Sequence, residues 1–173
     1  MMALRSEMAD PNMSCILKGE VIKMAVKVGI ISDTHNVLRP EVLESLRSCD
    51  YILHAGDITR ENILDQIRYF GNLYVVRGNN DRGWASHLSK KLKFEIGGIR
   101  FLMVHNKKDV GRDCQDADIV VYGHSHKYSE EIIEERLWLN PGSCGRQRFG
   151  GEVSFVLMEI EDGAYQYERI RIK

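Results

Sequence analysis

The sequence predicts a single α/β domain in which two β-sheets pack together and helices lie outside them. In the first half of the chain, short apolar runs alternate with helical segments, an order that implies a parallel sheet with right-handed crossovers. In the second half, strand-like segments follow one another and alternate apolar with polar residues, as strands with one wet face do. The length of 173 residues suits one compact domain with a sizeable core.

The start of the chain differs in character from the remainder. Five of the seven methionines lie within the first 24 residues, in a polar stretch without periodicity. We expect residues 1–23 to form an N-terminal extension, either loosely ordered or packed on the domain as a short helix or strand. Residues 24–173 are expected to form the single domain.

The elements of the first half are read from apolar runs and helix signals. Val26–Ser32 is a β-branched apolar run that is too short for a helix and right for a buried strand. Pro40 to Ser48 is typical of a helix with proline in its first turn. Tyr51–His54 is the next strand, Glu61–Phe70 is a helix with one apolar face, and Leu73–Val76 is the third strand.

The second half is richer in strands. Two expected strands, Leu92–Ile96 and Ile99–Val104, flank a pair of glycines that signals a hairpin. Ile119–Tyr122 is a further apolar strand. Four more segments alternate as half-buried strands do: Tyr128–Glu134, Arg136–Leu139, Val153–Ile160 and Tyr165–Ile172.

Composition narrows the class of protein. The 24 basic and 25 acidic residues give a net charge of -1, which argues against a general nucleic-acid binder. No apolar run approaches the ~20 residues needed to cross a membrane. The four cysteines form no C-x-x-C pair and suit free thiols in a reducing compartment. Because the first 23 residues also lack the apolar run of a signal peptide, we expect a cytoplasmic protein.

Polar side chains follow five of the predicted strands, just past the point where each strand ends. These candidates for metal ligation are Asp33, His35, Asp57, Asn79, His105, His124 and His126. In α/β sheets, ligand sites form at the carboxyl ends of the strands. Residues at i and i+2 of an extended chain point to the same side, so Asp33 with His35 and His124 with His126 can each aim at one point.

The types of side chain indicate a transition-metal site. Carboxylate with imidazole suits Mn, Fe, Zn or Ni better than Ca or Mg alone, and the absence of cysteine from the set argues against a structural zinc. Each short motif alone is an ordinary turn or loop. Their joint occurrence at successive strand ends favours a metal site.

The order of these motifs resembles that of the calcineurin-like metallophosphoesterases. D-x-H, G-D, G-N-x-D, a strand-end histidine and G-H-x-H follow one another. The forms S-D-T-H, H-A-G-D, Y-G-H-S-H and N-P-G-S are similar to the small phosphodiesterase branch, which includes bacterial and archaeal phosphodiesterases and the related retromer subunit. The resemblance runs from Met24 to the C terminus and implies a four-layer α/β/β/α sandwich of two mixed β-sheets flanked by helices.

The resemblance also implies two divalent metal ions bridged by Asp57. One ion would be held by Asp33, His35, Asp57 and His126, and the other by Asp57, Asn79, His105 and His124. Two cations ~3.5–4 Å apart can share a hydroxide that attacks phosphorus in line with the leaving oxygen. Asp57 and Asn79 would thus be catalytic, with Mn²⁺ the expected metal and Ni²⁺, Fe, Zn²⁺ or Mg²⁺ as alternatives.

Two positions depart from the family pattern. Asn80 stands where larger members carry a histidine thought to assist the leaving group, which favours substrates whose leaving group needs little protonation. His105-Asn106-Lys107 replaces the usual His-Gly-His, so the loop shape and the substrate preference are expected to differ. Asn80 and Arg82 are the candidates for contact with substrate.

Several supporting roles are expected around the site. His54 should pack beneath it, and Asp81 should orient its own loop through backbone hydrogen bonds. The turn Asn140-Pro141-Gly142-Ser143 should support the H-x-H loop.

The function that follows is a dinuclear metal-dependent phosphodiesterase acting on a small-molecule or nucleotide diester. A metal-binding scaffold of the same fold and a phosphomonoesterase remain as alternatives, because the motif does not separate them. By resemblance, a homodimer or homotetramer is expected.

Overall fold

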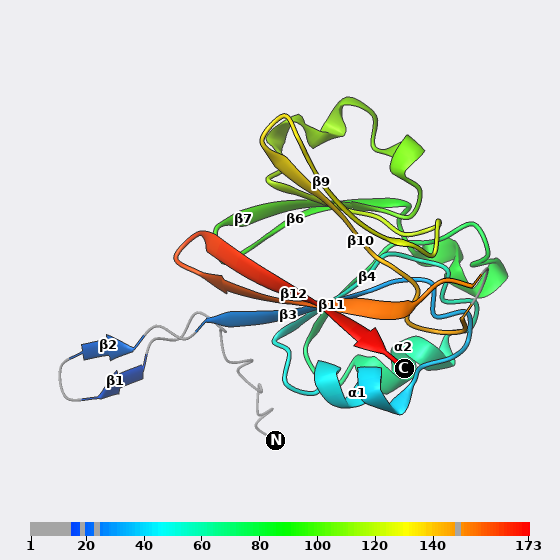
Figure 1. The fold of residues 1–173 in the computed structure, drawn as a ribbon, viewed down its shortest axis with the longest axis horizontal. Coiled ribbons are helices and arrows are strands. Elements are labelled where there is room, and N and C mark those ends of the chain that lie inside the picture. The colour runs from blue at the N-terminus through cyan, green and yellow to red at the C-terminus, as the bar shows by residue number, and fades with distance from the viewer. Residues whose placement is uncertain (1–14, 18–19, 23–24, 148–149) are drawn as a thin grey trace, which may run out of the picture.

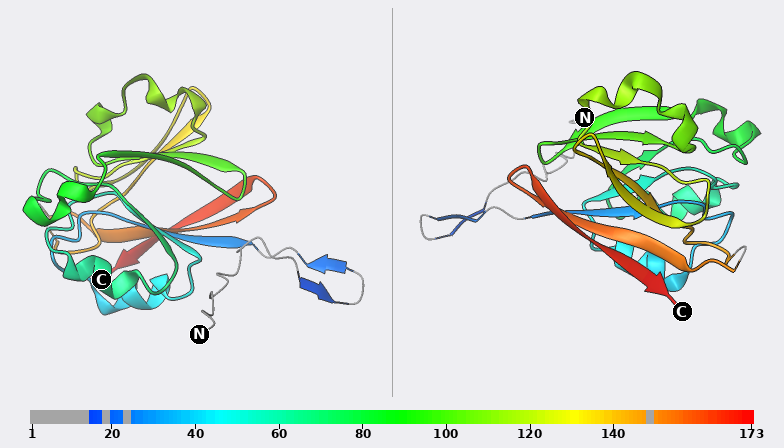
Figure 2. Two further views of the ribbon diagram at one scale, coloured as in Figure 1. Left: turned by 180° about the vertical axis from the view of Figure 1, so that it is seen from behind. Right: turned by 45° about the horizontal axis from the view of Figure 1, so that its top comes forward.

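The computed structural model describes residues 15–17, 20–22, 25–147 and 150–173. Two five-stranded sheets pack face to face, and the helices α1 and α2 cover the outer face of one of them (Figures 1 and 2). The predicted sandwich of two mixed sheets is confirmed.

The first sheet has the strand order β12-β11-β3-β4-β5. Its parallel part consists of β3 (Val26–Ile31), β4 (Tyr51–His54) and β5 (Asn72–Val75). β11 (Val153–Glu161) runs antiparallel to β3, and β12 (Ala164–Ile172) runs antiparallel to β11. The three parallel strands therefore end at one edge of the sandwich.

Helices α1 (Pro40–Leu46) and α2 (Asn62–Ile67) are shorter than the sequence pattern predicts. α1 ends in a tight turn in which Arg47 N–H bonds three residues back to Glu44 O, and α2 is followed by one in which Phe70 N–H bonds to Ile67 O. Both helices bury their apolar faces against the first sheet, in a cluster that includes Ile31, Ile52 and Phe155.

The second sheet has the strand order β6-β7-β8-β10-β9. Three central strands are parallel: β7 (Ile99–Val104), β8 (Ile119–Val121) and β10 (Arg136–Pro141). The edge strands β6 (Lys91–Ile96) and β9 (Tyr128–Ile133) pair antiparallel to them.

The outer layer over the second sheet differs from the expected helices. The described chain between β7 and β8 forms two 3₁₀ helices, η2 (Lys107–Asp109) and η3 (Gly111–Asp116), and no α-helix. A third 3₁₀ helix, η1 (Gly83–His87), follows the loop after β5. Short 3₁₀ segments lack a long periodic apolar stripe, so no pattern in the sequence indicated them.

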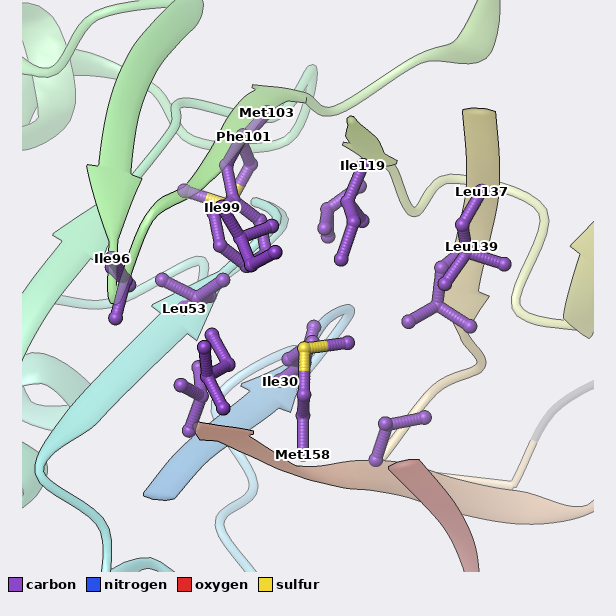
Figure 3. Packing of buried hydrophobic residues seen from close by; sticks show 14 of the residues in the cluster. Ile30, Leu53, Ile96, Ile99, Phe101, Met103, Ile119, Leu137, Leu139 and Met158 are labelled. Carbon is purple, nitrogen blue, oxygen red and sulfur yellow. The ribbon is translucent and has the colours of Figure 1, made fainter. Parts of the chain in front are cut away.

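The main core lies between the sheets. Ile30, Leu53 and Met158 of the first sheet face Phe101 and Leu139 of the second (Figure 3). All five side chains are buried. This packing holds the strand ends of both sheets in register at the edge where the polar loops emerge.

Part of the N-terminal extension is described. β1 (Cys15–Leu17) and β2 (Glu20–Ile22) form a two-stranded antiparallel sheet that pairs with neither large sheet. Residues 1–14, 18–19 and 23 of the predicted extension lie outside the described residues. Across the described chain, no helix combines the length and the apolar character that a membrane crossing requires.

Candidate metal centre

All seven candidate ligands lie in loops that leave the carboxyl ends of β3, β4, β5, β7 and β8. Five of them have left-handed backbone, with φ between 44° and 71°: Asp33, His35, Asp57, His124 and His126. A non-glycine residue adopts this conformation at a cost of about 1–3 kcal/mol, and such strain gathers at functional sites. The hydrogen bonds and packing of these loops hold the strained geometry in place.

Four of the candidates converge in a first set. Ligand-type atoms of Asp33, His35, Asp57 and His126 all lie within 4.8 Å of one another. Asp33, His35 and Asp57 are buried, and the His126 side chain is 10% exposed. His35 Nε2 lies 3.2 Å from His126 Nε2 and 3.6 Å from Asp57 Oδ2. His126 Nε2 lies 3.3 Å from Asp33 Oδ1.

A second set gathers on the other side of Asp57. His105 Nε2 lies 3.4 Å from Asp57 Oδ1 and 3.1 Å from Asn79 Oδ1. His124 Nδ1 lies 3.0 Å from the same Asn79 oxygen. The two carboxylate oxygens of Asp57 therefore face different groups of imidazole nitrogens.

The first set fits a divalent cation. Each ligand atom lies about 2.1 Å from a bound transition metal, so the ligand atoms of one ion lie roughly 3 Å apart. The separations between His35, His126 and Asp33 are close to this value. Asp33 Oδ1 is buried and accepts no hydrogen bond from a described residue, so ligation of a cation is the interaction that would satisfy it.

The second set is oriented in the way that metal-binding histidines are. The Nδ1 atom of His105 lies 2.7 Å from the backbone carbonyl oxygen of Ala55. When Nδ1–H donates to this oxygen, the Nε2 lone pair is directed at Asp57 and Asn79. A second hydrogen bond of this kind fixes the tautomer of a ligating imidazole.

The electrostatics of the centre suit a cation as well. Burial raises the pKa of Asp33 to about 7, against the lowering effect of His105. Burial alone would raise the pKa of Asp57, but hydrogen bonds from His105 and Asn80 outweigh it and hold that pKa below its usual range. Burial would lower the pKa of His105, and its contact with Asp57 reverses this and raises it. Protons held on Asp33 and His105 are those that a bound cation displaces.

The candidate substrate contacts have different surroundings. Asn80 donates from its backbone N–H to Asp57 Oδ1 at 2.9 Å and from Nδ2 to Asp57 Oδ2 at 2.6 Å. Its amide thus orients the Asp57 carboxylate, a role the sequence pattern did not predict. Arg82 is exposed, and its side chain makes no hydrogen bond or ion pair to another described residue.

Asp81 connects two loops of the centre. Its Oδ2 accepts from the backbone N–H groups of Gly78 at 2.8 Å and Asp57 at 2.9 Å, and its Oδ1 accepts from Thr59 N–H at 2.6 Å. The predicted bond within its own loop is confirmed by Gly78. The bonds to Asp57 and Thr59 go further, because they attach that loop to the one that carries the Asp57 carboxylate.

Glycines allow the loops to approach so closely. A Cβ on Gly78 would lie 2.2 Å from Asp57 Oδ1, and one on Gly123 would lie 2.0 Å from Ser32 Oγ. Ser32 Oγ itself donates to Asp33 Oδ2 at 2.7 Å. Sequence reasoning missed Ser32, and its place directly before Asp33 was the only signal available.

His54 lies beneath the centre as predicted. Its ring is fully buried, Gly56 N–H donates to Nδ1 at 3.2 Å, and Nε2 lies 3.1 Å from Thr34 Oγ1. Burial lowers the pKa of His54 to about 3, so the ring is neutral. It supports the loops of Asp33 and Asp57.

Asn140 and Pro141, expected in a turn, form the end of β10, and together with Gly142 and Ser143 they support the H-x-H loop as predicted. The buried Asn140 side chain donates from Nδ2 to Gly123 O at 2.8 Å and to Ser125 Oγ at 3.0 Å. Its Oδ1 accepts from Gly142 N–H at 2.9 Å. Ser143 Oγ donates to the backbone oxygen of Asp33 at 2.9 Å, so one turn holds two ligand loops.

Asn140→Ala is expected to destabilise the protein by about 2–4 kcal/mol, because Gly123 O and Gly142 N–H lose their buried partner. Urea unfolding followed by circular dichroism measures the loss. Asn72→Ala, at an exposed position of β5, is the matched control and should change the free energy of unfolding little. Equal stability of wild type and Asn140→Ala would show that the turn does not support the loop.

Comparison with known proteins agrees with this geometry. The family model of the calcineurin-like phosphoesterase superfamily domain matches residues 26–163. The "Probable metallophosphoesterase" of Methanothermobacter thermautotrophicus is 33% identical over 158 residues, which cover 83% of this chain and 91% of that protein.

Solved structures share the fold. The structure reported as a novel archaeal phosphodiesterase superposes with a TM-score of 0.69 at 21% identity, covering 84% of this chain and 100% of that one. Vps29 of Entamoeba histolytica in complex with zinc gives a TM-score of 0.68 at 23% identity, with 84% and 99% covered.

Proposed function

Because the chain belongs to the calcineurin-like phosphoesterase superfamily, we propose that it hydrolyses phosphate diesters with the help of two divalent cations. Asp33, His35, Asp57 and His126 would hold one cation. Asp57, Asn79, His105 and His124 would hold the other.

One observation carries the dinuclear proposal. The two carboxylate oxygens of Asp57 face separate sets, with Oδ2 3.6 Å from His35 Nε2 and Oδ1 3.4 Å from His105 Nε2. A carboxylate in this position can be shared by two ions. Asn79 completes the second set with a neutral oxygen, which leaves that set less negative than the first.

When bound, such ions supply Lewis acidity toward the phosphate oxygens and an activated water for attack on phosphorus. The protein's own residues would position these ions and their ligands. Asn80 holds the Asp57 carboxylate by two hydrogen bonds. An amide cannot donate a proton to a leaving alkoxide as an acid does, so this site favours diesters whose leaving alcohol is acidic.

Finer features belong to the same proposal. Mn²⁺ is the proposed cation, because carboxylate and amide oxygens suit it, with Ni²⁺, Fe, Zn²⁺ and Mg²⁺ as alternatives. A cytoplasmic location is in keeping with the free thiols of Cys49, Cys114 and Cys144. Assembly as a homodimer or homotetramer is also proposed.

A second function, that of a scaffold, is supported by the likeness to Vps29 structures. The filled ligand set favours catalysis over this alternative. All seven candidate positions carry side chains able to ligate, and the described residues bring them into two converging groups.

The deciding experiment is hydrolysis of bis-p-nitrophenyl phosphate and p-nitrophenyl phosphate by chelator-treated protein. Mn²⁺, Ni²⁺ or Mg²⁺ is then added back in turn. We expect no cleavage without metal, recovery with Mn²⁺, and preference for the diester. Preference for the monoester would make the protein a phosphomonoesterase, and no cleavage with any metal would favour the scaffold.

A further inference from the structure

A groove opens beside the candidate metal centre, on the outer face of the second sheet. Its volume is about 730 Å³, and His124 forms part of its wall. Residues of η2 line one side and residues of β9 line the other. The groove is therefore continuous with the place where a scissile phosphate would bind.

The floor of the groove is aromatic. Tyr122 and Trp138 both line it, with ring centroids 6.5 Å apart in an edge-to-face contact. Tyr122 is buried, whereas Trp138 is only partly buried and is the ring that a ligand can reach. Aromatic side chains of this kind stack with planar rings, and nucleobases are the commonest planar rings attached to phosphate esters.

The rim of the groove is basic. Lys107, Lys108 and Lys127 line it together with one carboxylate, Glu131. Lys107 Nζ lies 2.7 Å from Glu131 Oε1, whereas Lys108 and Lys127 form no ion pair with another described residue. The rim is thus left with excess positive charge, which attracts an anionic group.

The turn at Asn106, where η2 begins, shapes one side of this groove. Asn106 Oδ1 accepts from the Lys108 backbone N–H at 3.0 Å and so caps the start of η2. The turn places Lys107 Nζ 5.4 Å from the ring centroid of Tyr122 and 5.4 Å from that of Trp138. The Asn106-Lys107 pair, where the family pattern has Gly-His, therefore builds one wall of the groove.

We propose that this groove binds the nucleoside part of a nucleotide substrate, with the base against Trp138 and phosphate oxygens near Lys108 and Lys127. This inference rests on the proposed function and narrows its substrate class to nucleotide diesters. A planar ring and an anion are the two features that the floor and the rim recognise together.

Binding can be tested without turnover. The chain has two tryptophans, so in Trp84→Phe the emission comes from Trp138 alone. We expect adenosine 5′-monophosphate to quench this emission saturably and inorganic phosphate to leave it unchanged. Lys127→Ala in the same background should weaken nucleotide binding about threefold, as loss of one exposed charge contact does. Lys27→Ala, at the opposite end of β3, should have no effect.

Activity gives a second test in the Mn²⁺-loaded protein. Thymidine 5′-(p-nitrophenyl) phosphate and methyl p-nitrophenyl phosphate share one leaving group and differ only in the other ester. We expect kcat/KM for the nucleoside ester to be about tenfold higher, the effect of one stacked base. Trp138→Leu should remove this preference, so that the ratio of kcat/KM for the two esters falls to about one.

The two proposals fail in different ways. Hydrolysis of both esters at equal rates would overturn the groove inference, but it would still agree with the proposed phosphodiesterase activity. Absence of hydrolysis of either ester would overturn the phosphodiesterase, and the nucleotide titration would then decide the groove alone. Quenching by inorganic phosphate alone, or by neither compound, would overturn the groove inference.

Discussion

Asp57→Asn is expected to lower kcat/KM for a phosphate diester by at least about 10³-fold, because the shared carboxylate supports several kcal/mol of charge stabilisation in the transition state. The fold should survive the change. Asparagine has nearly the same size as aspartate. In the wild type, Asn80 N–H donates to Asp57 Oδ1 at 2.9 Å, and the Oδ1 of an asparagine can accept the same hydrogen bond. The substitution removes the negative charge that faces both sets of histidines.

Metal binding should fail together with activity. In wild type, Mn²⁺ at 100 times its Kd stabilises the folded state by about 2.7 kcal/mol, which raises Tm by about 5–10 °C. We expect no such rise in Asp57→Asn. Asp65→Asn removes an equal charge from an exposed residue on α2 and should behave as wild type. Undiminished turnover in Asp57→Asn would exclude the dinuclear proposal.

Asp81→Ala is expected to have the second largest effect and to act through position. Three backbone N–H groups, those of Asp57, Gly78 and Thr59, would lose their acceptor. At about 1–3 kcal/mol for each of the three unsatisfied groups, a loss of roughly 3–9 kcal/mol in the free energy of unfolding follows. The affinity for Mn²⁺ should fall about 10–100-fold, as it does when a residue that orients a ligand is removed.

Two readouts separate this positioning role from general instability. Excess Mn²⁺ should restore a large part of the activity of Asp81→Ala, because the ligands themselves remain. Asp81→Asn keeps one acceptor oxygen and should lie between wild type and alanine in both stability and Mn²⁺ affinity. Asp116→Ala, at an exposed position of η3, is the control. If its effect equals that of Asp81→Ala, the three hydrogen bonds do not position Asp57.

The strands were predictable because burial on a pleated sheet produces short runs of apolar or alternating apolar and polar residues. β4 and β7 have the bounds that their apolar runs indicated. The helix ends were not predictable to the residue, since tertiary contacts decide where α2 gives way to a turn. The 3₁₀ helices η2 and η3 have no periodic signature of their own.

The candidate ligands were predictable for a different reason. Strand ends and the i, i+2 spacing are local properties, so they bring Asp33 and His35 toward one point in any sheet of this kind. The roles of Asn80 and Asp81 depend on hydrogen bonds across 23 and 24 residues of chain. Contacts between loops of different strands are set by the assembled sheet, and one sequence does not display them.

The first set of candidate ligands draws on both sheets. Asp33, His35 and Asp57 follow strands of the first sheet, whereas His126 follows β8 of the second. His35 and His126 are 91 residues apart in sequence, yet their ring nitrogens meet at 3.2 Å. A cation bound there would act as a cross-link that closes a long loop and joins the two halves of the chain, much as a disulfide would. By joining these two halves, the bound cation would stabilise the whole domain. The same cation would thus serve both catalysis and global stability.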